Sequence, residues 1–293
     1  MNRRRNNGRA ASRRAAGTDR ADRPSVLPRQ VLATDLDGTI AFGGRPPAAA
    51  IITLLQRFAA AGDVRVVVAT SRAPHAVRGW LPGLGDRIDL LCCNGALVLR
   101  NGRALARQPL PPALVAAAVG VLDAAGEPYC MEYGDQFLAS APDALPWMGD
   151  TYRHNRWPGE IPRWDGVLKL SVAHADPWAE RLRAIGVGAA NVFAHGTGDA
   201  EVVAAGVGKA AALTELFGRD VPVVAFGNDE NDRQMLTVAT RSVVVGALLP
   251  GLDTLPQVRR IEAADPVILG ALSAELAIAE APTPRRWWDE AVS

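Results

Sequence analysis

The chain has 293 residues, of which 48% are hydrophobic and 22% are charged, and this length suits one or two domains of a globular protein. The composition excludes a chain that is disordered throughout, a collagen and a small disulfide-stabilised scaffold. The formal net charge of +1 is unevenly distributed, because residues 1–30 carry nine Arg against two Asp. We therefore expect a basic N-terminal segment on an acidic body.

Cysteine usage and hydropathy predict the compartment. Three cysteines, two of them adjacent at Cys92 and Cys93, suit neither a disulfide framework nor the usual zinc spacing. No apolar run reaches the roughly 18 residues of a membrane helix, and no apolar segment follows the N-terminal charges as in a secretory signal. We expect a cytoplasmic protein without a membrane partner.

The first part of the chain alternates strands with helices. Residues 1–29 lack apolar periodicity and are expected to form a disordered arm. The expected strands after it are 31–34, 64–69 and 88–92, and the expected helices lie at 51–58 and from Pro74 onward. This alternation predicts an α/β fold with a doubly wound parallel sheet.

The pattern changes in the middle of the chain and then returns. Residues 98–199 combine a hairpin at Asn101-Gly102, a helix at 112–125 and several short strands, which predicts an inserted α+β cap domain. After Gly206 the strand and helix alternation resumes. The predicted catalytic core therefore consists of residues 30–97 and 200–293.

Polar residues follow three of the predicted core strands. They are Asp35 to Thr39, Thr70 to Arg72 and Gly227 to Asp232. In an open parallel sheet the carboxyl ends of the strands meet in one crevice, where ligands bind. Converging carboxylates favour a bound cation, and oxygen ligands suit Mg²⁺. Taken singly, each segment could also be a turn or a helix cap.

These segments resemble the motifs of a known family. Asp35-Leu36-Asp37-Gly38-Thr39, Val68 to Arg72, Lys209-Ala210 and Gly227 to Leu236 resemble motifs I to IV of the haloacid dehalogenase superfamily. Leu91 to Ala96 is similar to a segment of its Cof-type sugar-phosphatase branch, which carries a large α/β cap between motifs II and III. The resemblance covers about residues 31–280 and implies a phosphohydrolase that uses Mg²⁺.

The resemblance also implies roles for single residues. Asp35 would be the nucleophile that forms an aspartyl-phosphate, and Asp37 the general acid and base. Phosphate would be bound by Thr70, Ser71, Lys209 and Asn231. The Mg²⁺ ligands would be Asp35, the backbone carbonyl of Asp37, Asn228 and Asp232.

One departure from the family pattern concerns the metal site. The family usually has Asp where this chain has Asn228, and an amide oxygen brings no negative charge, so metal affinity should fall. The neighbouring Asp229 is expected to compensate in part. An alternative is therefore a catalytically weak protein of the same fold that binds phosphorylated metabolites.

The substrate is predicted only by class, as a small phosphorylated metabolite such as a sugar or polyol phosphate. The candidate substrate residues are Asn94, Gly95, Arg72, Arg156 and Lys169. A second alternative is a nucleic-acid-associated protein that uses the basic arm. The arm lacks interleaved aromatic residues, so nucleic acid is the less favoured partner, and the sequence predicts no oligomeric state.

Overall fold

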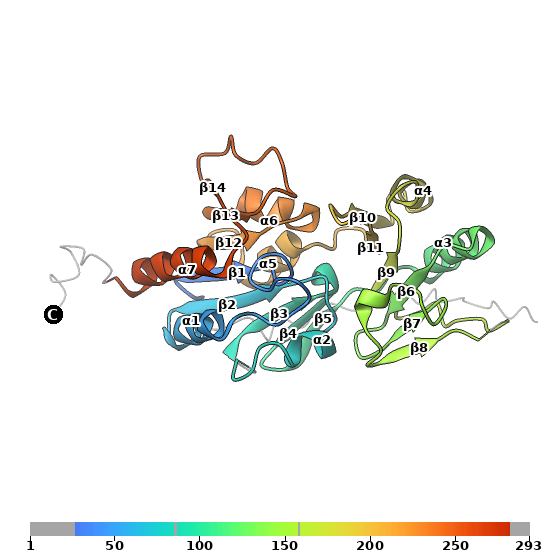
Figure 1. The fold of residues 1–293 in the computed structure, drawn as a ribbon, viewed down its shortest axis with the longest axis horizontal. Coiled ribbons are helices and arrows are strands. Elements are labelled where there is room, and N and C mark those ends of the chain that lie inside the picture. The colour runs from blue at the N-terminus through green and yellow to red at the C-terminus, as the bar shows by residue number, and fades with distance from the viewer. Residues whose placement is uncertain (1–26, 85–86, 158, 282–293) are drawn as a thin grey trace, which may run out of the picture.

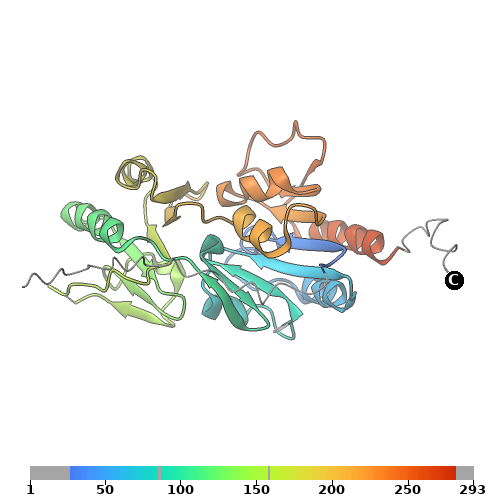
Figure 2. The ribbon, with the colours of Figure 1, turned by 180° about the vertical axis from the view of Figure 1, so that it is seen from behind.

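The computed structural model describes residues 27–84, 87–157 and 159–281, so the arm expected at 1–29 lies outside the described residues except for its last three. Two units lie side by side, as Figures 1 and 2 show from opposite sides. Within the described part of the chain, no helix is both long and apolar enough to cross a membrane.

The larger unit is built on an eight-stranded sheet. Its order is β14-β13-β12-β1-β2-β3-β4-β5, and the first six strands are mutually parallel. Their bounds are β1 Gln30–Thr34, β2 Val64–Ala69, β3 Asp89–Cys92, β4 Leu97–Arg100, β5 Arg103–Arg107, β12 Val223–Gly227, β13 Arg241–Val245 and β14 Val258–Ile261. The predicted α/β fold with a parallel sheet is confirmed.

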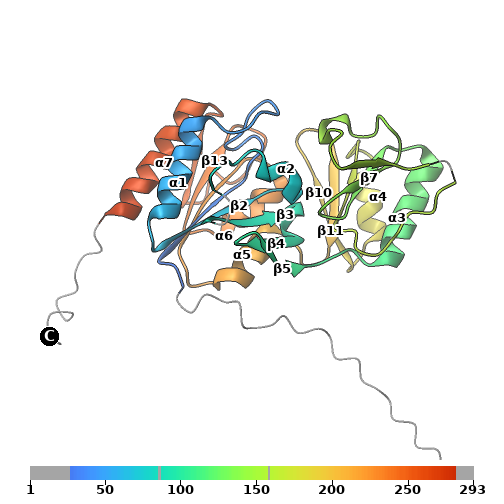
Figure 3. The same ribbon diagram turned by 90° about the horizontal axis from the view of Figure 1, so that it is seen from below.

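Helices cover both faces of this sheet. Helices α1 (Ala49–Ala60) and α7 (Asp265–Glu280) pack together on one face, and α5 (Lys209–Phe217) and α6 (Arg233–Val238) lie on the other (Figure 3). Neighbouring residues of β1 point to opposite faces of the sheet. Leu32 packs in the apolar cluster with α1 and α7, and Val31 packs in the cluster with α5 and α6. The sheet is therefore doubly wound. The short helix α2 (Pro74–Arg78) follows β2.

The smaller unit, here called the cap, is a second sheet with two helices. Its six strands have the order β10-β11-β9-β6-β7-β8. Its elements are α3 Pro112–Ala125, β6 Tyr129–Glu132, β7 Phe137–Ala139, β8 Arg153–Asn155, β9 Lys169–Val172, α4 Trp178–Ile185, β10 Ala190–Ala194 and β11 Ala200–Ala204. Helices α3 and α4 lie on the side of the cap sheet that faces away from the core (Figure 3). The other face of the cap sheet is thus turned toward the core.

The expected cap boundaries, residues 98 and 199, differ from the structure at both ends. The hairpin of β4 and β5 extends the core sheet, because β4 pairs with β3 over four residues. At the other end, β11 pairs with β9 and β10 inside the cap sheet. The hairpin signal predicted two paired strands but not the sheet that they join. The cap is therefore better described as residues 108–208.

Some elements depart from the sequence expectation. Strands β8, β11 and β14 were not expected, since all three are short and carry polar residues. Residues 230–238 do not form one continuous α-helix but are divided into the 3₁₀ helix η5 (Glu230–Asp232) and α6. Asp229 and Asp232 form a capping box there, which tightens the first turn. Two further 3₁₀ helices are η3 (Cys93–Gly95) and η4 (Pro146–Met148).

Candidate active site

A cavity of about 560 Å³ lies where the carboxyl ends of the core strands face the cap. Asp35 follows β1, Ser71 and Arg72 follow β2, and Asn228 follows β12. The predicted convergence of these three strand ends is therefore what the structure shows. The cap contributes the other wall, through residues that include Glu132, Trp147, Lys169, Ser171, His195 and Glu201.

Lys209 joins two carboxylates at the base of the cavity. Its Nζ lies 2.7 Å from Asp35 Oδ1 and 2.6 Å from Asp232 Oδ1, and the Lys209 side chain is fully buried. Burial raises the pKa of Asp35 to about 7, although the Lys209 ammonium acts to lower it. Burial likewise opposes the charge on Lys209, but Asp232 and Asp35 outweigh it and raise its pKa.

Asp232 is oriented by its own backbone turn. Its Oδ2 accepts hydrogen bonds from the backbone N–H groups of Asn228, at 3.0 Å, and of Asp229, at 3.3 Å. A Cβ at Gly227 would lie 2.6 Å from Asp232 Cβ, so this turn closes only around glycine. One oxygen of Asp232 thus binds Lys209, and the other binds the backbone of the turn that carries Asn228. The predicted direct ligation of a metal by Asp232 stays a prediction.

The Asn228 amide and the Asp35 carboxylate contact the same threonine hydroxyl. Thr39 Oγ1 lies 3.1 Å from Asp35 Oδ2 and 3.2 Å from Asn228 Oδ1, so both oxygens face the same hydroxyl. Gly38 adopts φ 74°, and a Cβ there would lie 2.2 Å from Asn228 Nδ2. Glycine is required at this turn both for its backbone conformation and for the close approach of the amide.

The oxygen donors around Asp35 fit a divalent cation such as Mg²⁺, but only as a weak set. They comprise the Asp35 carboxylate and the Asn228 amide, which are hard ligands of the kind that Mg²⁺ prefers. Within the described residues, no three His, Cys, Asp or Glu side chains gather to hold a metal ion. One carboxylate in place of two lowers the charge available to bind the ion. Ligation by the Asp37 backbone carbonyl stays a prediction.

Asp37 is held by an arginine at the mouth of the cavity. Arg72 donates from Nε to Asp37 Oδ2 at 2.6 Å and from Nη2 to Asp37 Oδ1 at 2.8 Å. The Arg72 guanidinium also stacks on the Trp80 ring, 3.7 Å from its centroid. The Asp37 side chain is 43% exposed, so a substrate entering the cavity can reach it. Arg72 therefore fixes the direction of the carboxylate that is predicted to act as acid and base.

Thr70, Asn94 and Asn231 form a buried brace, of which Asn231 lines the cavity. The Asn94 side chain donates to Glu201 Oε2 at 2.7 Å and accepts from Asn231 Nδ2 at 2.9 Å. Its backbone N–H donates to the Thr70 carbonyl at 3.0 Å, and Thr70 Oγ1 accepts from the Arg72 N–H. Asn94 has φ 58°, which asparagine tolerates better than most residues.

The brace leaves Asn94 fully buried, with both ends of its amide engaged by protein groups. It therefore lies behind the cavity wall and orients the residues that form the wall. A Cβ at Gly95 would lie 2.8 Å from the Gly208 carbonyl, so Gly95 allows η3 to approach the start of α5. Substrate contact by Asn94 and Gly95, as the sequence predicts, stays a prediction that this burial does not favour.

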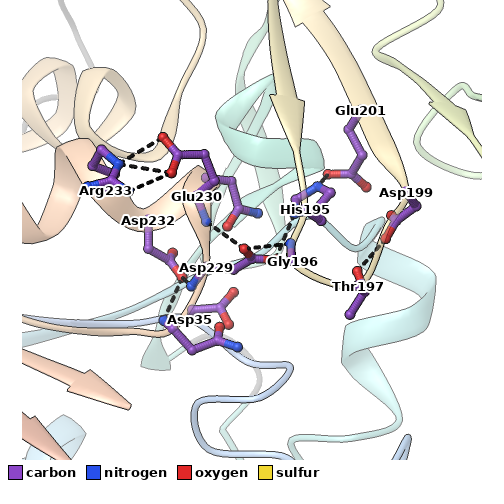
Figure 4. A network of polar contacts seen from close by, with 12 residues as sticks. Asp35, His195, Gly196, Thr197, Asp199, Glu201, Asp229, Glu230, Asp232 and Arg233 are labelled. Atoms are coloured by element: carbon purple, nitrogen blue, oxygen red, sulfur yellow. Dashed lines mark hydrogen bonds and ion pairs between the residues drawn. The ribbon is translucent and has the colours of Figure 1, made fainter. Parts of the chain in front are cut away.

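A chain of ion pairs joins the cap to the core (Figure 4). His195, in the turn between β10 and β11, lies with Nδ1 3.0 Å from Asp229 Oδ2 and Nε2 3.0 Å from Glu201 Oε2. Burial disfavours a charged ring, but Glu201 and Asp229 outweigh it and raise the pKa of His195 to about 10. His195 is thus an imidazolium between two carboxylates.

Lys169 continues this chain of charges. Its Nζ donates to the Ser71 carbonyl at 2.8 Å and forms an ion pair with Glu201. Burial acts to raise the pKa of Glu201, but Lys169 and His195 outweigh it and hold that pKa well below its usual range. Lys169 lines the cavity, but its charge is already balanced by Glu201, and its predicted contact with substrate stays a prediction.

Arg156, a predicted substrate residue, is not brought to the cavity. Its Nη1 lies 2.6 Å from Asp123 Oδ2 and 2.6 Å from Tyr129 Oη, and its Nε donates to the Glu160 carbonyl at 2.9 Å. These contacts tie β8 to α3 at the side of the cap. Arg156 is not among the residues that line the cavity, so its predicted substrate contact stays a prediction that this position does not favour.

Comparison with known proteins decides the family. The profile of the haloacid dehalogenase-like hydrolases matches residues 32–252. The chain belongs to the haloacid dehalogenase-like hydrolase family. The resemblance that the sequence motifs predicted is confirmed, and the chain is a hydrolase by family. A comparison with curated proteins finds no match.

Several solved structures share this fold. A Streptococcus mutans protein has a TM-score of 0.72 at 19% identity, over 84% of this chain and 98% of that chain. A haloacid dehalogenase-like hydrolase from Bacteroides thetaiotaomicron has a TM-score of 0.69 at 18% identity, over 84% of this chain and 99% of its own. A sugar phosphatase of subclass IIB has a TM-score of 0.68 at 17% identity, over 84% of this chain and 98% of its own. These likenesses show that the core and cap arrangement is shared.

Sequence reasoning missed the functional geometry of the cap. It assigned no role to His195, Glu201 or Glu132, and it expected Asp229 to compensate for Asn228 at the metal. Asp229 instead uses its carboxylate to bind His195, Gly196 N–H and Glu230 N–H. A polar residue within a short strand, as at Glu132 or Glu201, was the only signal available, and it does not say which face the residue occupies.

Proposed function

We propose that the chain is a phosphatase that uses Mg²⁺ and hydrolyses a small phosphorylated metabolite, a sugar or polyol phosphate, through an aspartyl-phosphate. The observation that carries this proposal is the buried contact of Lys209 with Asp35 and Asp232 at the base of a cavity that Asp37 overlooks. It supports nucleophilic attack by a carboxylate beside a fixed positive charge. The family membership, and the fold that the chain shares with a sugar phosphatase, agree with it.

In the first step, an Asp35 oxygen attacks phosphorus while the ester bond to the leaving alcohol breaks. Asp37, held by Arg72 through one carboxyl oxygen and protonated on the other, donates that proton to the departing oxygen. In the second step, Asp37 accepts a proton from a water that attacks phosphorus, which releases phosphate and regenerates Asp35. The atoms balance as ester plus water giving alcohol plus phosphate.

Lys209 supplies a compact positive charge beside the transferring group. Asp232 keeps the Lys209 ammonium in place when Asp35 becomes phosphorylated, because the lysine retains one partner at 2.6 Å. A cation held by Asp35 and Asn228 would neutralise charge on the phosphoryl oxygens. The cap excludes bulk water from the cavity and carries the residues that meet the leaving alcohol.

The test is phosphate release from a panel of sugar, polyol and nucleotide phosphates, measured with Mg²⁺ and with a chelator. Release that depends on Mg²⁺ and favours sugar or polyol esters is the expected result. If phosphate were released at the same rate in the presence of the chelator, the reaction would not require a metal ion. No release from any ester would disprove the phosphatase.

The rival is a protein of the same fold that binds phosphorylated metabolites but turns them over weakly. The observation that favours it is the uncharged amide of Asn228, which shares the Thr39 hydroxyl with Asp35. Calorimetric binding and phosphate release, measured together, separate the two. A binder would bind a sugar phosphate but release no phosphate at any Mg²⁺ concentration. For the enzyme, the rate of phosphate release should rise with Mg²⁺ and reach a plateau.

A further inference from the structure

The face of the cap sheet that is turned toward the core carries a group of polar side chains. Glu132 pairs with Lys169 across β6 and β9, and Ser171 pairs with Glu201 across β9 and β11. Partners in an antiparallel pair share a face, as do residues two apart in a strand. All four residues therefore lie on one face, opposite the apolar face of Tyr129, Met131 and Leu170 that packs under α3 and α4.

Two of these four residues have hydrogen-bonding atoms without a partner. Lys169 and Glu201 bind each other, and each has a further partner. Among the described residues, Glu132 Oε2 and Ser171 Oγ are buried and make no hydrogen bond. Both residues are 3% exposed, and both line the cavity that contains Asp35 and Asp37. A buried polar atom without a partner is costly, so such atoms mark a place for a ligand.

We propose that Glu132 and Ser171 form a hydroxyl-binding subsite that selects a polyhydroxylated leaving group, and this rests on the phosphatase function proposed above. They are diagonal neighbours across β6 and β9, a relation that sets such positions roughly 7–8 Å apart. A hexose or hexitol chain can offer one hydroxyl to each. The carboxylate oxygen accepts from a hydroxyl, and the serine hydroxyl donates or accepts.

The charges around the subsite exclude other leaving groups. A second phosphate or a carboxylate would meet the Glu132 carboxylate and Glu201, since the Lys169 ammonium is already engaged by Glu201 and Ser71. An apolar leaving group would bury both unpaired atoms without giving either a partner. Burial raises the pKa of Glu132 to about 7 against the opposing effect of Lys169, so the repulsion of an anionic leaving group is complete only above that pH.

The test compares three esters of matched chain length: hexitol phosphate, hexyl phosphate and aminohexyl phosphate. The readout is the ratio of kcat/KM for hexitol phosphate over hexyl phosphate. Ser171→Ala and Glu132→Leu are each expected to lower this ratio by roughly tenfold, because each removes a buried hydrogen bond to the substrate. Glu132→Gln should keep most of the ratio, since its amide oxygen still accepts. Glu180→Gln and Ser273→Ala, at exposed positions of α4 and α7, are the matched controls and should leave the ratio unchanged.

Each other outcome overturns the proposal in a distinct way. An unchanged ratio in both Ser171→Ala and Glu132→Leu, with phosphate still released, would disprove the subsite and leave the phosphatase standing. A preference for aminohexyl phosphate that is lost in both Glu132→Gln and Glu132→Leu would make Glu132 an ammonium site. No release from any ester by the wild type would disprove the phosphatase itself. Ser171→Ala deletes only an unpartnered hydroxyl, so it is expected to fold with an unchanged unfolding midpoint.

Discussion

Asp229 of the core accepts a hydrogen bond from His195 of the cap, with 3.0 Å between Asp229 Oδ2 and His195 Nδ1. Asp229 Oδ1 accepts a second bond across the same boundary, from the Gly196 N–H at 3.1 Å. Asp229 follows Asn228, the position where the family usually has the acidic metal ligand. In this chain the next residue, Asp229, is acidic, and its carboxylate binds the cap.

The first prediction concerns the stability that the contact between His195 and Asp229 provides. The folded-state pKa of His195 is raised to about 10 from an ordinary value of 6.5. The His195 imidazolium therefore makes its full contribution to the free energy of unfolding below pH 6.5, and this contribution is lost as the pH rises through about 10. His195→Gln should lower the free energy of unfolding by roughly 3 kcal/mol near neutral pH, and the loss should shrink toward pH 10. Denaturant unfolding at several pH values measures it.

His174→Gln is the matched control for that experiment. His174 also contacts a carboxylate, with Nδ1 2.9 Å from Glu127 Oε1, but its side chain is 66% exposed. Solvent screens such a pair, so its removal should cost less than about 1 kcal/mol. Equal losses for His174→Gln and His195→Gln would contradict the cap contact as a source of stability.

The second prediction tests the amide at the metal site. Asn228→Asp would add a negative charge beside Asp35 Oδ2, where Thr39 Oγ1 now bridges the two side chains. The Mg²⁺ concentration for half-maximal rate should fall by roughly tenfold, since each carboxylate raises the affinity for a hard cation. Without Mg²⁺ the variant should be less stable than the wild type, because two buried carboxylates then repel each other. A higher Mg²⁺ requirement would argue against Asn228 as a ligand.

Local patterns predicted the core of the site. Asp35 and the Thr70 segment directly follow apolar strands, and strands in a parallel sheet end on one edge, so their convergence could be inferred without coordinates. The same reasoning explains why Lys209, at the start of a helix between strands, reaches Asp35. Asp35, Thr70 and Lys209 are thus positioned by single strands and helices, which short stretches of sequence are enough to predict.

The cap could not be predicted in the same way. The contacts of His195 with Asp229 and of Lys169 with Ser71 join residues 34 and 98 positions apart, and they depend on how two sheets face each other. Glu132 occupies the inner face only because β6 pairs with β9 in one register, and a shift of one residue would turn it outward. Short strands do not carry enough pattern to determine that register.

The third prediction separates the acid role of Asp37 from its other contacts. Arg72→Lys would replace a bidentate contact with a single one and lose the stacking on Trp80. The kcat for a polyol phosphate should fall by roughly tenfold or more, because Asp37 is no longer oriented toward the leaving oxygen. For p-nitrophenyl phosphate, whose leaving group needs no proton, the fall should be smaller. An equal fall for both esters would assign Arg72 to phosphate binding instead.

The fourth prediction concerns Lys209. Lys209→Met would leave Asp35 and Asp232 buried without their shared cation, and it should lower the unfolding free energy by about 3–5 kcal/mol at neutral pH. The loss should be smaller at acid pH, where Asp35 is protonated. Lys209→Arg keeps the charge but cannot fit the compact contact at 2.6–2.7 Å, so it should recover part of the stability and little of the rate. Full activity of Lys209→Arg would contradict this geometry.

The fifth prediction identifies the nucleophile. Asp35→Asn keeps the shape of the side chain but removes the attacking carboxylate, so phosphate release should fall by at least ~1,000-fold. The free energy of unfolding should change by less than about 2 kcal/mol, because the variant loses an ion pair with Lys209 but also a costly buried charge. Asp143→Asn, at an exposed position of the cap, is the matched control and should retain the full rate. Incubation of the wild type with substrate, followed by acid quench and mass spectrometry, should detect phosphate on Asp35. Full turnover by Asp35→Asn, or phosphate found on another residue, would reassign the nucleophile.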